Sequence, residues 1–196
     1  GNGEFGKPTD IQVDSSDKIY VVDKTNNTIS TYNSGGTKTG SIGTPGTAGI
    51  QQPGGQLWHP VSIDIDENAN EIVVLDLQQI LDSTTGQMVD GARIQYFDLV
   101  TGAPLAGRSY SKFGYNNAGM TFDMDCMCMK TVYDISMGQL TRPNQVTVDA
   151  SSRIYVTDAR LQKVMVYDNI DTWLGTIDST VSPLRIPMGL TIGAAS

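Results

Sequence analysis

Short runs of alternating hydrophobic and polar residues recur along the chain, and each pair of runs predicts a β-hairpin. In the first pair, Ile11–Asp14 and Lys18–Asp23 are separated by the turn residues Ser15–Asp17. Three pairs share this construction: 11–14 with 18–23, 63–66 with 71–76, and 146–149 with 153–158. β-Branched runs bounded by Asp, Ser and Asn are typical of paired antiparallel strands. We therefore expect three hairpins of nearly identical construction.

A third run follows each hairpin, and a weaker fourth run follows the third. The third runs are 29–33, 94–98 and 164–168, and the fourth lie near 37–42, 104–110 and 172–177. Helical periodicity is not sustained anywhere, so we predict an all-β chain of four-stranded antiparallel sheets. The apolar residues of the first runs are expected to pack between neighbouring sheets: Ile11, Val13, Ile63, Ile65, Val146 and Val148.

A proline motif precedes each hairpin. It consists of a small or turn residue, a large apolar residue two places on, two variable residues and a proline. Its prolines are Pro8, Pro60, Pro143 and, in a less faithful copy, Pro187. Repeats at such spacings indicate stacked units, because one unit cannot bury its apolar face alone. We predict one domain over 1–196, with repeats at about 3–53, 54–136, 137–181 and 182–196, the last stopping after its first strand.

Together, the proline motif, the Asp that ends each second strand and the aromatic residue near the end of each third strand resemble the NHL repeat family of six-bladed β-propellers. The resemblance implies that each repeat is a four-stranded blade. At roughly 40 to 50 residues per blade, a closed six-bladed ring would need about 270 residues. We therefore expect an incomplete or fragmentary ring. The alternative is a closed four-bladed ring in which 111–136 form a degenerate blade.

The resemblance also gives the aspartates at the ends of the second strands a role. In the family this residue commonly faces a basic residue that opens the third strand. The corresponding pairs here are Asp76 with Arg93 and Asp158 with Lys163, whereas Asp23 faces Thr28. This departure suggests a local brace, worth less than about 1 kcal/mol if it is exposed.

Two insertions interrupt the repeats, and the first is 77–91, between the second and third strands of the second repeat. Its apolar residues Leu77, Ile80, Leu81 and Met88 are candidates for binding a partner, because long loops on rigid scaffolds often carry binding residues. The alternative, which we favour, is a flap packed over its own blade.

The second insertion, 111–136, is rich in sulfur. Candidate soft-metal ligands are Met124, Cys126, Met127, Cys128 and Met129, whose thiols and thioethers suit Cu(I). In a strand, Met124, Cys126 and Cys128 would share one face, and the two other methionines would lie on the opposite face. Because that splits the ligand set, we favour buried filler or a disordered excursion, and we expect no cofactor.

Composition narrows the possible partners. The net charge of −8 and the pI of about 4.4 argue against nucleic acid, which requires a basic face. No apolar run approaches the roughly 18 residues that a membrane helix needs, so we expect no membrane insertion. A sequence rich in Thr, Gly and Asn with little Lys suits a secreted or periplasmic bacterial protein.

Catalytic chemistry is sparse. The only histidine, His59, precedes Pro60, which the family layout places near one mouth of the central channel. Related six-bladed lyases hold their metal with several histidines, so a single histidine supports that mechanism poorly. A calcium-dependent lactonase would need acidic and amide residues at the axis, and five residues are candidates: Asp64, Asp66, Glu67, Asn68 and Asn70. Asp66, however, aligns with the turn residues Asp14 and Asp149, which favours a role in the hairpin turns.

The function that these observations favour is a non-catalytic interaction scaffold in an extracellular or periplasmic location. We expect its partner to be another protein, the remaining blades of a longer chain, or a second copy of itself, because an open arc leaves apolar blade faces in water. One alternative is part of a metal-dependent lyase or lactonase. Another is a soft-metal or redox accessory protein that uses residues 120–137.

Overall fold

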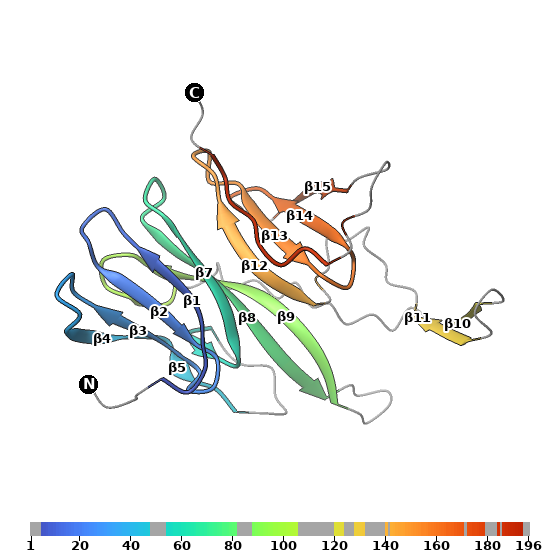
Figure 1. The fold of residues 1–196 in the computed structure, drawn as a ribbon, viewed down its shortest axis with the longest axis horizontal. Coiled ribbons are helices and arrows are strands. Elements are labelled where there is room, and N and C mark those ends of the chain that lie inside the picture. Colours follow the sequence, from blue (N-terminus) through green and yellow to red (C-terminus); the bar gives the residue numbers. More distant parts are fainter. Residues whose placement is uncertain are drawn as a thin grey trace.

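The fold is all-β, as predicted. The computed structural model describes residues 5–47, 54–81, 88–105, 120–123, 128–131, 140, 142–170, 172–178, 184 and 186–193. These residues form fifteen strands and, within the described ranges, no helix (Figure 1). No described segment is therefore a helix long and apolar enough to cross a membrane.

The first and third repeats are four-stranded antiparallel sheets whose strands follow one another in chain order. The first sheet consists of β1 (Pro8–Val13), β2 (Ile19–Asp23), β3 (Thr28–Tyr32) and β4 (Lys38–Ile42). The third consists of β12 (Pro143–Val148), β13 (Ile154–Asp158), β14 (Lys163–Tyr167) and β15 (Trp173–Ile177). Both agree closely with the strands expected from the alternation.

The second repeat is a three-stranded sheet of β7 (Pro60–Asp66), β8 (Glu71–Leu81) and β9 (Met88–Asp98). Most of the fourth strand predicted near 104–110 lies outside the described residues, and Pro104 forms a single bridge with Phe97. Most of the insertion 77–91 is not a loop. It lengthens β8 and β9, whose pairing continues to Leu81 opposite Met88. In this extension of the ladder Ile80 lies opposite Val89.

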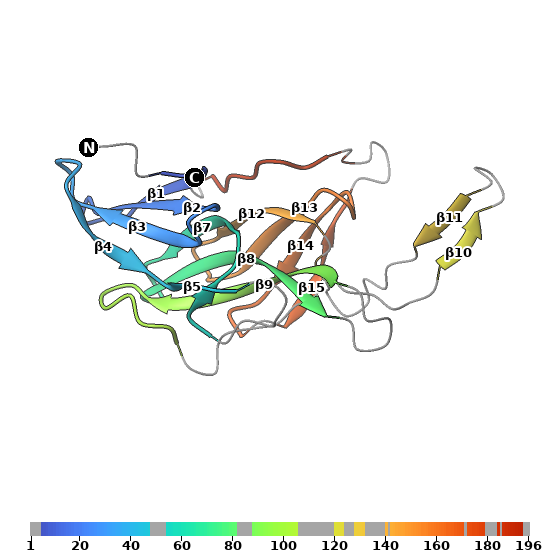
Figure 2. The same cartoon turned by 90° about the horizontal axis from the view of Figure 1, so that it is seen from below.

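Two short pairs of strands complete the fold. β5 (Thr44–Pro45) runs parallel to β6 (Gln56–Leu57) in the connection between the first two repeats. β10 (Met120–Asp123) pairs with β11 (Cys128–Thr131) in an antiparallel hairpin that projects to the side of the three sheets (Figures 1 and 2).

Each proline of the first three motifs opens the first strand of its repeat and lies opposite an aspartate of the second strand. The pairs are Pro8 with Asp23, Pro60 with Asp76 and Pro143 with Asp158, and in each repeat the register shifts directly after the proline. A proline can open a strand because its missing N–H is not needed there. The threefold recurrence of this geometry accounts for the proline motif.

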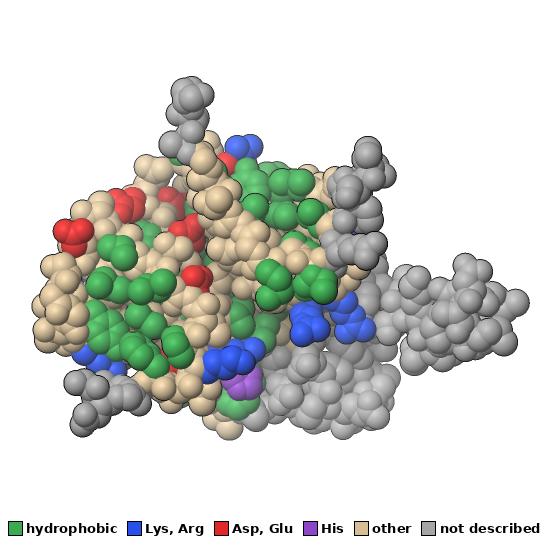
Figure 3. All heavy atoms as spheres, viewed as in Figure 1, with side chains coloured by type: hydrophobic (Ala, Val, Ile, Leu, Met, Phe, Trp, Pro, Cys, Tyr) green, Lys and Arg blue, Asp and Glu red, His purple; other side chains and the backbone are tan. Residues whose placement is uncertain are grey.

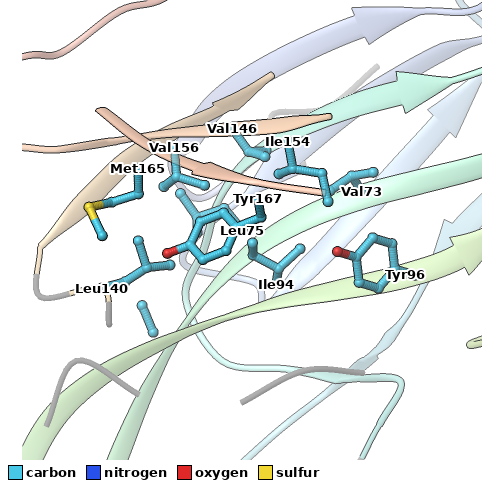
Figure 4. Close-up of a cluster of buried hydrophobic side chains, with 11 residues drawn as sticks. Val73, Leu75, Ile94, Tyr96, Leu140, Val146, Ile154, Val156, Met165 and Tyr167 are labelled. Atoms are coloured by element: carbon cyan, nitrogen blue, oxygen red, sulfur yellow. The ribbon is translucent and has the colours of Figure 1, made fainter. Parts of the chain in front are cut away.

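The hydrophobic core lies between consecutive sheets. One cluster joins the first and second sheets and includes Tyr20, Val22, Ile63 and Ile72. A second cluster joins the second and third sheets (Figure 4): Val73, Leu75, Ala92, Ile94, Tyr96, Leu140, Val146, Ile154, Val156, Met165 and Tyr167. The three sheets form an open arc of stacked layers (Figures 1 and 2).

The burial predicted for the first strands is only partly correct. Ile63 and Val146 are fully buried, and Ile65 and Val148 pack at the edges of the two clusters. Ile11 and Val13, however, are 59% and 53% exposed. The prediction failed for these two residues because burial at this position requires a preceding sheet, and no described sheet precedes the first one.

Candidate functional site

The first strands of the three repeats are linked by hydrogen bonds that run from one repeat to the next. β7 lies between β1 and β12 and contacts both. In each link, the side chain two residues after the proline accepts the backbone N–H located three residues after the next repeat's proline. We call this series the inter-repeat relay: Asp10 Oδ2 to Ile63 N (3.0 Å), Ser62 Oγ to Val146 N (3.1 Å) and Gln145 Oε1 to Leu190 N (2.5 Å).

Ser62 connects three repeats. Its hydroxyl donates to Asp10 Oδ2 at 2.6 Å while accepting the Val146 N–H. The Ser62 side chain is only 1% exposed. Because buried polar groups must be paired, the hydroxyl holds all three first strands in register.

Asp64 forms a second set of links between the second and third repeats. Its Oδ2 accepts the Thr147 hydroxyl at 2.8 Å and the Val148 N–H at 2.7 Å. Its Oδ1 accepts the N–H of Ile65 at 2.9 Å. Both carboxylate oxygens are therefore used in structural hydrogen bonds.

The remaining lactonase-type candidates lie in or beside the β7–β8 turn. Their contacts are Asp66 Oδ1 with Ala69 N (3.0 Å), Glu67 Oε1 with Ser15 N (2.6 Å), Asn68 Nδ2 with Ala150 O (3.1 Å) and Asn70 Nδ2 with Asp98 Oδ2 (3.2 Å). The predicted turn role of Asp66 is confirmed, and Glu67 and Asn68 also join this turn to the neighbouring hairpins. Within the described ranges, no three His, Cys, Asp or Glu side chains are grouped to hold a metal ion.

The turn aspartates of the other two repeats work in the same way. Asp14 accepts the N–H groups of Ser16 and Lys18 and the Tyr20 hydroxyl, and Asp149 makes the corresponding bonds in the third repeat. Burial acts to raise the pKa of Asp14, but these donors outweigh burial and leave its pKa lowered. Asp14 is therefore a charged turn acceptor.

Asp23 joins the proline motif to the β2–β3 turn. Its carboxylate accepts the N–H groups of Gly6 and Lys7 from the motif, and of Thr25 and Asn26 from the turn. Burial acts to raise the pKa of Asp23, but the four backbone donors outweigh it, and the pKa is lowered. Four backbone N–H donors around one carboxylate explain why the first repeat needs no basic partner opposite Asp23.

In the second repeat the expected basic partner is present. Arg93 Nη2 lies 3.2 Å from Asp76 Oδ2, and Trp58 N–H and Gln95 Nε2 also donate to this carboxylate. Asp76 and Arg93 are 0% and 2% exposed, so the pair is not the exposed brace that the sequence suggested. Burial raises the pKa of Asp76 to about 7 despite these donors, and burial lowers the pKa of Arg93.

In the third repeat the salt bridge of Lys163 is with a different residue. Lys163 Nζ contacts Asp178 Oδ2 at 3.0 Å. Asp158 lies directly opposite Lys163 in the strand ladder, as expected. Its carboxylate accepts backbone N–H groups from Arg142, Arg160 and Leu161, so backbone donors surround Asp158 as they surround Asp23.

His59 lies directly before β7 with a positive φ of 56°. Its N–H donates to Asn27 Oδ1 of the first repeat at 2.8 Å, and its ring lies 4.5 Å from the Trp58 ring. Figure 3 shows the half-buried histidine beside basic side chains. The described contacts of His59 thus connect two repeats.

The insertions contribute little to a described site. Leu77 is half-buried and packs against the core between the second and third sheets, whereas Ile80, Leu81 and Met88 are described only as members of β8 and β9. Met124, Cys126 and Met127 lie outside the described residues. Cys128 and Met129 belong to β11, where they lie opposite Asp123 and Phe122 of β10.

Two hollows lie at the edges of the sheets. One, of about 440 Å³, lies beside β3 and β4 and is lined largely by hydroxyl groups, including those of Thr31, Tyr32 and Thr39. The other, of about 360 Å³, lies between Arg142, Arg160, Ile186 and Met188. The first lining is mainly polar, whereas the second combines two arginines with apolar side chains.

Sequence reasoning missed the inter-repeat relay. The signal was present, because the residues two places after the first three prolines are Asp10, Ser62 and Gln145, which all carry acceptor oxygens and are all followed by an aliphatic residue. Comparing the polar positions of the repeats as closely as the apolar ones would have revealed it.

Comparisons with known proteins show the fold. No family model and no curated protein matches the chain. It is similar in structure to Kuenenia stuttgartiensis hydrazine synthase, with 8% identity and a TM-score of 0.55 over 93% of this chain and 38% of that one. It is also similar to a gluconolactonase from Xanthomonas campestris, with 14% identity and a TM-score of 0.51 over 91% of this chain and 50% of that one. The chain thus spans half or less of either protein, and its all-β, propeller-like arrangement is open.

Proposed function

We propose that this chain is an arc of an NHL-type β-propeller that serves as a non-catalytic interaction scaffold for a protein partner. The observation that carries the proposal is the use of the polar side chains on the first strands. Asp10, Ser62 and Asp64 are all bonded to the next repeat, and Asp64 is one of the residues that a lactonase would need as a free ligand. These side chains hold the blades in register.

The recurrence of the proline–aspartate pair supports the assignment to NHL-type repeats. In three successive sheets a proline opens the first strand opposite an aspartate, and that aspartate accepts N–H groups from the proline motif. The sequence pattern that carries the resemblance thus corresponds to one repeated set of contacts.

The alternative function is a metal-dependent enzyme, because the chain is similar in structure to a gluconolactonase. For Asp64 to bind a metal ion, it would have to give up bonds to Val148 N and the Thr147 hydroxyl. Leaving a buried donor without a partner costs about 1–3 kcal/mol per group. That cost favours the scaffold over the enzyme.

The surface supports a protein partner, and the composition supports the location that we propose for this chain. A net charge of −8 disfavours nucleic acid, whereas the exposed aliphatic side chains on the first sheet suit a protein. We place the scaffold outside the cytoplasm, in an extracellular or periplasmic location, on the grounds of composition. Fractionation of the native source with an antibody to this chain tests that placement, and a purely cytoplasmic signal would contradict it.

Metal analysis of the purified protein tests the function. We expect substoichiometric calcium and zinc, no rise in melting temperature when either ion is added, and no hydrolysis of gluconolactone. Stoichiometric metal that is lost in Asp64→Ala but retained in the control Asp17→Ala would overturn the scaffold and support the enzyme.

A further inference from the structure

The first sheet presents to solvent the same face that the second and third sheets bury. Equivalent residues of the three repeats show this directly. The sets, in repeat order, are Phe5, Leu57 and Leu140 (42%, 0% and 0% exposed), and Ile11, Ile63 and Val146 (59%, 0% and 1% exposed). The chemistry of the face is the same in each repeat, and only its coverage differs.

The strand register confirms that the faces correspond. In the first sheet Val13 pairs with Ile19, and Ile19 pairs with Tyr32. The matching rows are Ile65, Ile72 and Phe97 in the second sheet, and Val148, Ile154 and Tyr167 in the third. Directly opposed residues point to the same side of a sheet, so each row crosses the face that meets the preceding repeat.

We call the solvent-facing side of the first sheet the uncovered face, which consists of Phe5, Ile11, Val13, Ile19, Val21 and Tyr32. Figure 3 shows apolar side chains gathered over this part of the molecule. Phe5 and Tyr32 lie with ring centroids 5.9 Å apart. None of the six is charged, and an apolar sheet face of this kind normally packs against another layer.

We propose that the uncovered face binds a further propeller blade supplied by polypeptide other than a second copy of this chain. The proposal rests on the scaffold function and names its docking surface. The reason is continuity with two interfaces already present in the chain, in which Tyr20 and Val22 cover Ile63 and Ile72, and Leu75 and Tyr96 cover Val146 and Ile154. The occupant must present large aliphatic or aromatic residues at the positions of Tyr20 and Val22.

The inter-repeat relay adds a polar requirement. The N–H groups of Ile63 and Val146 bond to a side chain of the preceding repeat, but the N–H of Ile11 bonds to Oδ1 of its own Asp10 at 2.9 Å. The docked blade should therefore carry an acceptor such as Asp, Ser or Gln two residues after its proline. That acceptor would take over the Ile11 N–H.

A second copy of this chain does not meet this requirement. At the far end of the arc, Leu190 N–H and Pro187 O already bond to Gln145 and Asn144, which places residues 187–190 where the first strand of a next repeat would lie. In that segment the relay position is Gly189, which has no side chain to accept a bond. A second copy added in the same manner would offer the Ile11 N–H no acceptor in place of its own Asp10.

Duplication of the first repeat tests the proposal. Residues 3–54 are placed once more in front of Gly3, which gives the two prolines the same spacing as Pro8 and Pro60. The added repeat then offers Tyr20, Val22 and Asp10 to the uncovered face. We expect hydrogen exchange of the Ile11 amide in the original repeat to slow at least about tenfold, towards the rate of Ile63.

Two substitutions make the test specific. Asp10→Ala in the added repeat should remove most of this protection, whereas Val100→Asp, at a 76% exposed position on the second repeat, should leave it unchanged. No added protection in a folded duplicated chain would overturn the proposal. The proposal would also be overturned if light scattering gave the wild-type chain a mass of about twice 21.1 kDa and its Ile11 amide were protected from exchange. A second copy would then be the occupant.

The wild-type chain provides a test that does not depend on duplication. It should bind a hydrophobic dye, and Ile11→Ser with Val13→Ser should remove at least half of the dye signal with little change in melting temperature. An unchanged dye signal would refute the uncovered face. Stoichiometric calcium or zinc would overturn the scaffold function alone, so the two failures are distinguishable.

Discussion

Ile63 and Ile11 occupy the same position in consecutive repeats, and replacing each with alanine measures what coverage by a neighbouring sheet contributes to stability. Ile63 is fully buried against the first sheet, in a cluster that includes Tyr20 and Val22. Ile→Ala changes in such surroundings cost about 2–5 kcal/mol, because a cavity adds to the lost burial. We expect Ile63→Ala to lower the free energy of unfolding by about 3 kcal/mol.

Ile11 should respond much more weakly. It is 59% exposed, so it retains less than half of a burial energy worth about 1.5–3 kcal/mol for a complete side chain, and its removal leaves no cavity. We expect Ile11→Ala to cost about 1 kcal/mol or less. At about 2–4 °C per kcal/mol for a chain of this size, the two variants should differ in melting temperature by at least about 4 °C.

Urea unfolding followed by circular dichroism and by tryptophan fluorescence, at two protein concentrations, measures both variants. Equal losses for the two variants would refute the reasoning, since Ile11 would then be covered in solution. A loss below about 1 kcal/mol for Ile63→Ala would equally show that the first two sheets do not pack as described.

Three further predictions concern polar and backbone contacts. Asp64→Ala should lower the free energy of unfolding by about 1–3 kcal/mol, because Val148 N–H and the Thr147 hydroxyl lose their acceptor. Asp64→Asn keeps an acceptor oxygen and should cost less. Equal losses of stability for the two variants in urea unfolding would contradict the link between the second and third repeats. Burial raises the pKa of Asp76 to about 7, so between about pH 4 and 7 the folded chain binds a proton that the unfolded chain has released. The stability of wild type relative to Asp76→Asn should therefore fall as pH rises through this window and level off above it, and a rise would contradict the assignment. Gly43→Ala should lower the melting temperature more than Gly36→Ala. Both glycines have φ near +75°, but a Cβ at Gly43 would lie 2.6 Å from Leu57 Cδ1, whereas a Cβ at Gly36 would have no atom within 4 Å.

Alternation in the sequence was sufficient to predict the strands because each hairpin encodes its own period and its own turn. The third and fourth strands of the first and third repeats follow from the same signal, and Asp66 could be assigned to a turn by alignment with Asp14 and Asp149. These are local properties, set by neighbours within a few residues.

Properties that depend on a distant neighbour could not be predicted in this way. Ile11 and Ile63 are the same residue in the same motif, and only the presence of a preceding sheet separates an exposed side chain from a buried one. Likewise, the sequence of 77–91 alone does not predict the register that places Ile80 opposite Val89. Lys163 forms its salt bridge with Asp178, while Asp158 accepts backbone N–H groups that reach it only when the turn has formed.

The candidate site was predicted least well, because its contacts join repeats rather than residues within one. From the sequence alone, Asp64 could be a free carboxylate. In the structure it bonds to Thr147 and Val148, more than eighty residues later in the chain. The residue two places after the proline is of a different type in each repeat, but in each repeat its side chain supplies an acceptor oxygen.

The inter-repeat relay makes the arc behave as a one-dimensional chain of coupled units. Each link joins only adjacent repeats, so the stability of the whole is close to a sum of repeat energies and nearest-neighbour coupling energies. The second repeat has two coupling partners and the first has one. Unfolding should accordingly begin at the first repeat and propagate inward, and a lesion at Ser62 would weaken both couplings of the second repeat at once.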